Sequence, residues 1–141
     1  MAMRWWSCSL ALLVVVAACV SSVTRYYVPT PGQPRYDTAQ ATDVLEQYLG
    51  VQCPERLAAK KSDNGEVRVT VKIDPAGAVT SAQLTTSTGD ETLDGLFGTV
   101  AAQMKVDPPR DMEGRSEMTG RIRMGYSCSP SAAVATIQLV P

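Results

Sequence analysis

Residues 66–73 read Glu-Val-Arg-Val-Thr-Val-Lys-Ile, and this octapeptide determines the expected architecture. Its apolar residues occupy every second position, with charged or hydroxyl side chains between them. Such alternation is typical of a β-strand that has one buried and one exposed face. The Asp-Pro-Ala-Gly sequence at 74–77 predicts a tight turn, and residues 78–86 then form the return strand. Because Val79 is out of phase with Ala82, we expect a bulge between them.

A helical pattern precedes this hairpin. From Asp37 to Leu49 the apolar residues fall at positions i, i+3, i+4, i+7 and i+8, which form one stripe of a helix. Gly50 occupies the position of a left-handed cap, and Pro54 opposes immediate continuation. We therefore expect this helix to end near Leu49, with a further short helical piece at 55–61.

A second helical pattern follows the hairpin. Thr88 is the expected N-cap, because Glu91 three residues later completes a capping box, and apolar residues continue at helical spacing to Met104. Residues 118–126 alternate again, and residues 133–140 form a last apolar stretch suited to an edge strand. The sequence thus predicts an α+β fold, with a small antiparallel sheet of three or four strands and helices packed on one face.

The first 19 residues have the zones of an export signal. A positive Arg4 precedes the apolar run 10–16, and the small residues Ala17 and Ala18 lead to Cys19. The sequence Val-Ala-Ala-Cys at 16–19 resembles the bacterial lipobox, which implies acylation of Cys19 and cleavage before it. An ordinary cleaved signal peptide, or an uncleaved helix with an incidental cysteine, is the alternative.

The expected organisation has three parts. Residues 1–18 are a lipoprotein signal peptide, 19–36 a lipid-anchored linker containing prolines, and 37–141 the folded domain. Val20 and Ser21 follow the cysteine where an aspartate would favour inner-membrane retention. By analogy with bacterial sorting, we expect a lipid-anchored envelope protein at the outer membrane, facing the periplasm.

The cysteines support the same compartment. Cys8 leaves with the leader and Cys19 carries lipid, so Cys53 and Cys128 remain as an even pair in an oxidising compartment. We expect a disulfide between them. A buried thiol pair or a metal site are alternatives, but two cysteines without histidine do not complete a tetrahedral zinc site.

Composition argues against several functions. The formal charge is −1, which offers no basic excess for nucleic acid, and there is no histidine to serve as general base. The obvious carboxylates are Asp74, Asp90, Glu91 and Asp94, which suit a turn and a helix N-terminus better than catalysis. We therefore expect no enzymatic activity, no cofactor and no metal.

Residues 65–126 resemble the C-terminal domain of TonB-family proteins. The resemblance lies in Gly65-x-Val67-x-Val69-x-Val71-x-Ile73-Asp74-x-x-Gly77-x-Val79, then Thr86-Ser87-Thr88-Gly89-Asp90-x-x-Leu93-Asp94, then Pro108-Pro109. It implies a small α+β domain that binds other envelope proteins, in TonB itself by pairing an edge strand with a segment of an outer-membrane transporter. The lipobox and short linker depart from an energy transducer, which has an uncleaved membrane helix and a long linker.

These observations predict a non-catalytic, lipid-anchored protein that binds another envelope protein by sheet-edge pairing. The expected edge is the strand at 118–126, with Arg121, Arg123 and Met124 contacting the partner. The arginines could equally form a solvated face that discourages aggregation. The alternative function is a TonB-like energy transducer, with an uncleaved N-terminal helix, that serves outer-membrane transport.

Overall fold

The computed structural model describes residues 25–108 and 114–140. In chain order the elements are β1 (Arg25–Tyr27), α1 (Thr38–Ala58), β2 (Asn64–Ile73), β3 (Val79–Leu84), α2 (Glu91–Ala102), β4 (Met118–Cys128) and β5 (Ala133–Val140). The expected lipid anchor at Cys19 and the whole signal peptide lie outside the described residues.

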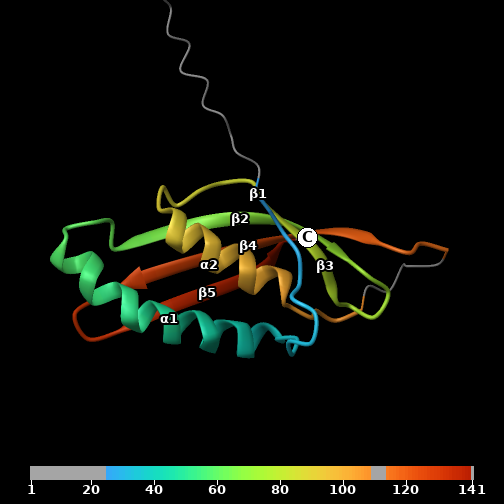
Figure 1. The fold of residues 1–141 in the computed structure, drawn as a ribbon, viewed down its shortest axis with the longest axis horizontal. Helices are drawn as coiled ribbons and strands as arrows, with labels where there is room; N and C mark the ends of the chain where they lie inside the picture. The colour runs from blue at the N-terminus through green and yellow to red at the C-terminus, as the bar shows by residue number, and fades with distance from the viewer. Residues whose placement is uncertain (1–24, 109–113, 141) are drawn as a thin grey trace, which may run out of the picture.

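The strands form one antiparallel sheet in the order β1-β3-β2-β4-β5. Both helices lie on the same face of this sheet, with α1 packed against β5 and β4 and α2 against β3 and β2 (Figure 1). The predicted α+β class is therefore confirmed. The sheet has five strands instead of three or four, because residues near each end of the chain add an edge strand.

The hairpin of β2 and β3 follows its sequence pattern. Gly77 takes a positive φ of 88° in the turn, and the Asp74 carboxylate accepts hydrogen bonds from the N–H groups of Ala76 and Ala78. Lys72 pairs with Ser81 and Ile73 with Val79. One residue on β3 is thus left over between these pairs, which confirms the expected bulge.

Helix α1 is longer than predicted. It continues through Gly50 and Pro54 to Ala58. Proline at position 54 cannot donate to the Gly50 carbonyl, but Gly50 is exposed, so water can satisfy that oxygen. Beyond it, Cys53 and Arg56 are buried on the inner face. Their tertiary contacts hold the last turns helical, and the expected end near Leu49 was wrong.

Helix α2 begins two residues later than the capping box predicted. Asp90 is the N-cap, and its carboxylate accepts hydrogen bonds from the N–H groups of Thr92 and Leu93. Thr88 instead donates its hydroxyl and its backbone N–H to the buried Asp94. The expectation of Thr88 as N-cap was wrong because an ionised carboxylate at position 90 binds the free N–H groups of the first turn.

Residues 25–36 belong to the folded unit, although their composition suggested a linker. Strand β1 pairs with β3, and Arg35 donates to the carbonyls of Val79 and Ala102 at 2.5 and 3.1 Å. Tyr27 lies over α2, where a Cβ atom on Gly98 would be only 2.2 Å from its ring. The linker boundary at residue 36 is therefore corrected: the described fold begins by residue 25.

The core lies between the helices and the sheet. Its largest fully buried side chains are Phe97, Leu45, Leu49, Leu93, Met104, Ile122, Met124, Val67, Val69, Val71 and Val79. The alternating valines of β2 all face the helices, as the alternation at 66–73 predicted.

Candidate functional site

Strand β4 is not an edge. It pairs with β2 on one side and with β5 over Arg121–Cys128 on the other, so from Arg121 onward its backbone groups are occupied within the sheet. The expected binding edge at 118–126 was therefore wrong. The final apolar stretch closes that edge, and β5 presents a new one.

The three predicted partner-binding residues separate onto two faces. Arg121 is exposed and Arg123 half-buried on the sheet face opposite the helices, whereas Met124 is fully buried among the core residues on the helix side. Because successive side chains of a strand point to opposite faces, Met124 cannot contact a partner together with the two arginines. It is a core residue.

The outward backbone groups of β5 can be assigned from two hydrogen bonds. The N–H of Cys128 on β4 donates to Asp63 at 2.6 Å, and thus points away from β5. The N–H of Ala135 donates to the Glu46 carboxylate of α1 at 3.1 Å, and thus points away from β4. Orientation alternates along a strand. The N–H groups of residues 133, 135, 137 and 139 therefore face outward from the sheet.

Helix α1 covers only part of this edge. Glu46 caps the N–H of Ala135, and beyond it the outward N–H groups of Ile137 and Leu139 have no hydrogen-bond acceptor among the described residues. The Leu139 side chain is 50% exposed. The C-terminal half of β5 is thus an open edge with two free donors among the described residues, and the strand order β1-β3-β2-β4-β5 places it at the end of the sheet opposite β1.

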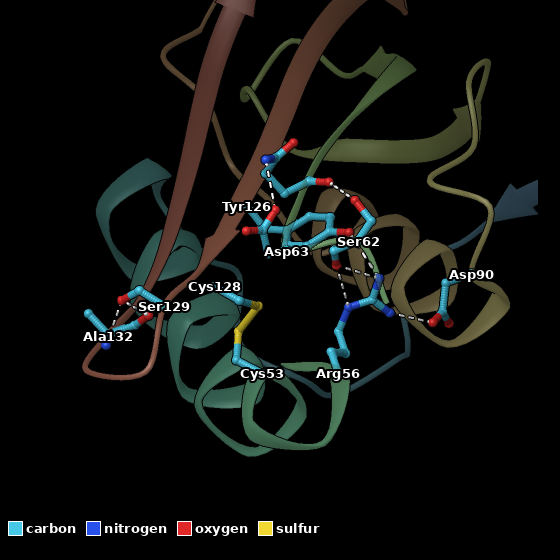
Figure 2. Close-up of a disulfide and its surroundings, with 10 residues drawn as sticks. Cys53, Arg56, Ser62, Asp63, Asp90, Tyr126, Cys128, Ser129 and Ala132 are labelled. Atoms are coloured by element: carbon cyan, nitrogen blue, oxygen red, sulfur yellow. Dashed lines mark hydrogen bonds and ion pairs between the residues drawn. A yellow bond between two sulfur atoms is a disulfide. The ribbon is translucent and has the colours of Figure 1, made fainter. Parts of the chain in front are cut away.

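The cysteine pair links the end of α1 to the end of β4. The sulfur atoms of Cys53 and Cys128 are bonded, with their Cα atoms 5.3 Å apart and a separation of 75 positions in the sequence (Figure 2). The predicted disulfide is confirmed. It fixes the last turns of α1 against the strand that adjoins β5.

A buried arginine lies beside the disulfide. Arg56 is 5% exposed, donates to the Asp90 carboxylate at 2.5 Å and to the Ser62 carbonyl at 3.0 Å. It also donates to the Tyr126 hydroxyl at 3.2 Å and lies over that ring, 5.5 Å from its centroid. Figure 2 shows these groups converging on the guanidinium from β4, the loop before β2 and the start of α2.

The charge state of Asp90 follows from this cluster. Partial burial on its own raises the pKa of the carboxyl, but the hydrogen bonds from Leu93 and Thr92 and the Arg56 guanidinium outweigh it. The net effect is a lowered pKa, so Asp90 is ionised at neutral pH. It holds α1 to α2 through Arg56, a role that helical spacing at 55–61 alone did not reveal.

The remaining carboxylates of the predicted acidic group serve local structure. Asp74 closes the hairpin turn. Asp94 is 5% exposed and accepts from Ser87 and from Thr88. Glu91 pairs at the surface with Arg25 of β1. These side chains do not converge on a common cavity, and within residues 25–108 and 114–140 no three cysteine, aspartate or glutamate side chains are grouped to hold a metal ion.

The helices and the comparisons with known proteins give two further findings. Among the described residues, neither helix is both long and apolar enough to span a bilayer. Comparison with protein-family models, with curated proteins and with solved structures finds no match to this chain.

Proposed function

We propose that this chain is a lipid-anchored, non-catalytic protein of the bacterial cell envelope that binds another envelope protein by adding a strand to β5. The observation that carries this proposal is the open edge at Ile137 and Leu139, where two outward N–H groups lack acceptors in the described fold. Main-chain hydrogen bonds to an incoming segment supply affinity in this mode of recognition. The resemblance of residues 65–126 to TonB-family C-terminal domains supports the same mode.

The position of β5 relative to the anchor supports this choice of edge. Six residue steps separate Cys19 from Arg25 at the start of β1, so their Cα atoms lie at most about 22 Å apart when the chain is fully extended. Strand β1 forms one edge of the sheet and β5 the other. Four strand spacings, about 19 Å, lie between them. A lipid on Cys19 would thus be attached at the β1 edge, and β5 is the edge of the sheet farther from that attachment.

The short tether also bears on the alternative function, that of a TonB-like energy transducer. An energy transducer that reaches across the periplasm needs a long linker, and residues 25–36 are part of the fold instead. This favours passive binding over energy transduction.

The β5 edge can be tested without disturbing the sheet. Leu139→Pro removes an outward N–H and leaves the β4–β5 hydrogen bonds, because proline is tolerated at a sheet edge when its nitrogen faces solvent. Leu139→Ala removes a similar side chain but retains the donor. We expect a photo-crosslinking residue at the exposed Gln138 to give one discrete partner adduct in cells, which Leu139→Pro abolishes and Leu139→Ala preserves.

The matched controls make this result specific. The same photo-crosslinker at Tyr26, on the opposite edge, is expected not to give that adduct. Equal melting temperatures of the two Leu139 variants, within a few degrees, exclude unfolding as the cause. Persistence of the adduct in Leu139→Pro would show that strand addition at β5 is not the binding mode.

The anchor has its own test. Metabolic labelling with a palmitate analogue is expected to label the wild-type chain, and Cys19→Ser is expected to lose both the label and the membrane association. Three acyl chains on one residue give a stable anchor, whereas the folded part of the chain offers no membrane helix among its described residues. An intact Met1 on the mature protein, found by mass spectrometry, would overturn the lipoprotein assignment.

A further inference from the structure

The sheet face opposite the helices carries a cluster of three arginines, which we call the basic hollow. Arg68 of β2 and Arg121 and Arg123 of β4 line a depression of about 380 Å³. Arg68 and Arg123 are directly opposite each other in the β2–β4 register, and Arg121 is two residues along the same face. Three guanidinium groups can therefore reach a common point above the sheet.

The positive charge of the basic hollow is only partly balanced. Glu66 lies beside Arg123, with Oε1 3.2 Å from Nε. Within the described part of the chain, no carboxylate lies within 4.0 Å of a side-chain nitrogen of Arg68 or Arg121. The four groups together carry a charge of +2, from three arginines and one glutamate, although the chain as a whole has a formal charge of −1.

This arrangement has an energetic cost when the hollow is empty. Like charges directly opposite each other across two strands destabilise a sheet. In addition, Nε of Arg123 is buried yet lacks an acceptor in hydrogen-bond geometry among the described residues, despite its proximity to Glu66. A buried donor without an acceptor is unfavourable. An anion bound in the hollow would offset both effects.

We propose that the basic hollow binds a phosphate monoester. A phosphate monoester carries a charge between about −1.5 and −2 at neutral pH, which matches the local excess, and it offers several acceptor oxygens to planar guanidinium forks. The half-buried Thr70 also lines the hollow. The volume exceeds that of a water molecule, about 30 Å³, more than tenfold, which leaves room for the group that bears the phosphate.

The arginines of the basic hollow are separate from the β5 edge, although Val140 of β5 also lines the hollow. Its arginines project from β2 and β4 on the open face, whereas strand addition uses the outward backbone of β5. Either binding event can therefore be lost while the other remains. The phosphate can be presented by a soluble molecule or by a membrane lipid headgroup, and the chemistry that recognises it is the same.

Calorimetric titration of the full chain, purified from membranes in a neutral detergent, tests the proposal. The soluble probe is glycerol 3-phosphate, and the lipid probe is short-chain phosphatidate in the same micelles. We expect saturable binding of at least one probe, weakened tenfold or more by the double variant Arg68→Gln/Arg121→Gln. Tighter binding of phosphatidate identifies a lipid source, and tighter binding of glycerol 3-phosphate identifies a soluble one.

A matched variant distinguishes binding in the basic hollow from nonspecific attraction of an anion to positive charge. Lys61→Gln/Lys105→Gln makes the same change of net charge at exposed positions outside the hollow, and we expect it to weaken binding less than twofold. Neither double variant is expected to lower the melting temperature, since the replaced side chains are exposed and the loss of Arg68 removes a like-charge repulsion with Arg123. Absence of heat with both probes, equal weakening by the two double variants, or tighter binding of a glutamate-rich peptide than of either phosphate would overturn the proposal.

Discussion

Replacing both disulfide cysteines, as Cys53→Ala/Cys128→Ala, is expected to lower the free energy of unfolding by about 4 kcal/mol. The bond closes a loop between residues 75 positions apart, and in the chain-entropy model a loop of this length restricts the unfolded chain by about that amount. Both cysteines are buried, so alanine also leaves small unfilled volumes. Urea titration of the purified protein, monitored by circular dichroism, measures the change.

Reduction provides the control for this prediction. Wild-type protein in dithiothreitol keeps both side chains and loses only the covalent link, so it should show most of the same loss. If the reduced protein and the alanine variant both unfold within 1 kcal/mol of the oxidised wild type, the disulfide does not stabilise the domain through its loop.

The second large effect is expected at the ion pair between Arg56 and Asp90. Asp90→Ala removes the N-cap of α2 and leaves the Arg56 side chain, which is 6% exposed, without its counter-charge. Removing one partner of a buried pair costs about 3 to 5 kcal/mol. Arg56→Met should lower the free energy of unfolding by less, because the Asp90 carboxylate keeps its hydrogen bonds from the N–H groups of Thr92 and Leu93.

Asp90→Asn separates the contribution of the helix cap from that of the charge, since an asparagine still caps the helix but carries no charge. Urea titration should show a larger loss of stability for Asp90→Ala than for Asp90→Asn. A greater loss for Arg56→Met than for Asp90→Ala would contradict the assignment of the uncompensated arginine as the main cost.

The ion pair between Arg56 and Asp90 also predicts how the stability of the fold changes in acid. The pKa of Asp90 is lowered in the folded protein, and in the unfolded chain it is about 3.9. The stabilisation by the ionised carboxylate is therefore fully present above about pH 4, and it is lost as the pH falls below that value through the folded pKa. The difference in stability between wild type and Asp90→Ala should accordingly stay constant above about pH 4 and shrink as the pH falls further.

Several elements were predictable because their signals are local. The alternation at 66–73 and 118–126 defines strands with one buried face, and the Asp-Pro-Ala-Gly turn joins the first of them to its return strand. The phase shift after Val79 located the bulge. The pairing of Cys53 with Cys128 followed from the prediction that only two cysteines remain available after export.

Other elements depended on contacts between distant residues. Residues 25–36 contain prolines and no apolar period, yet Tyr27 and Arg35 find partners on α2 and β3 that the sequence pattern does not reveal. Pro54 is a local signal against a helix, and the burial of Cys53 and Arg56 overrides it. The sequence pattern did not single out Arg56, which the structure surrounds with Asp90, Ser62 and Tyr126.

The candidate binding features divide in the same way. The sequence by itself determined which side chains of β2 and β4 share a face, because alternation along a strand depends only on local backbone geometry. It placed Arg121 and Arg123 on one face, and the same alternation assigns Met124 to the other. Only the tertiary structure decided which strand is the edge and which arginines meet in the basic hollow, because strand order and register are set by the packing of residues far apart in the chain.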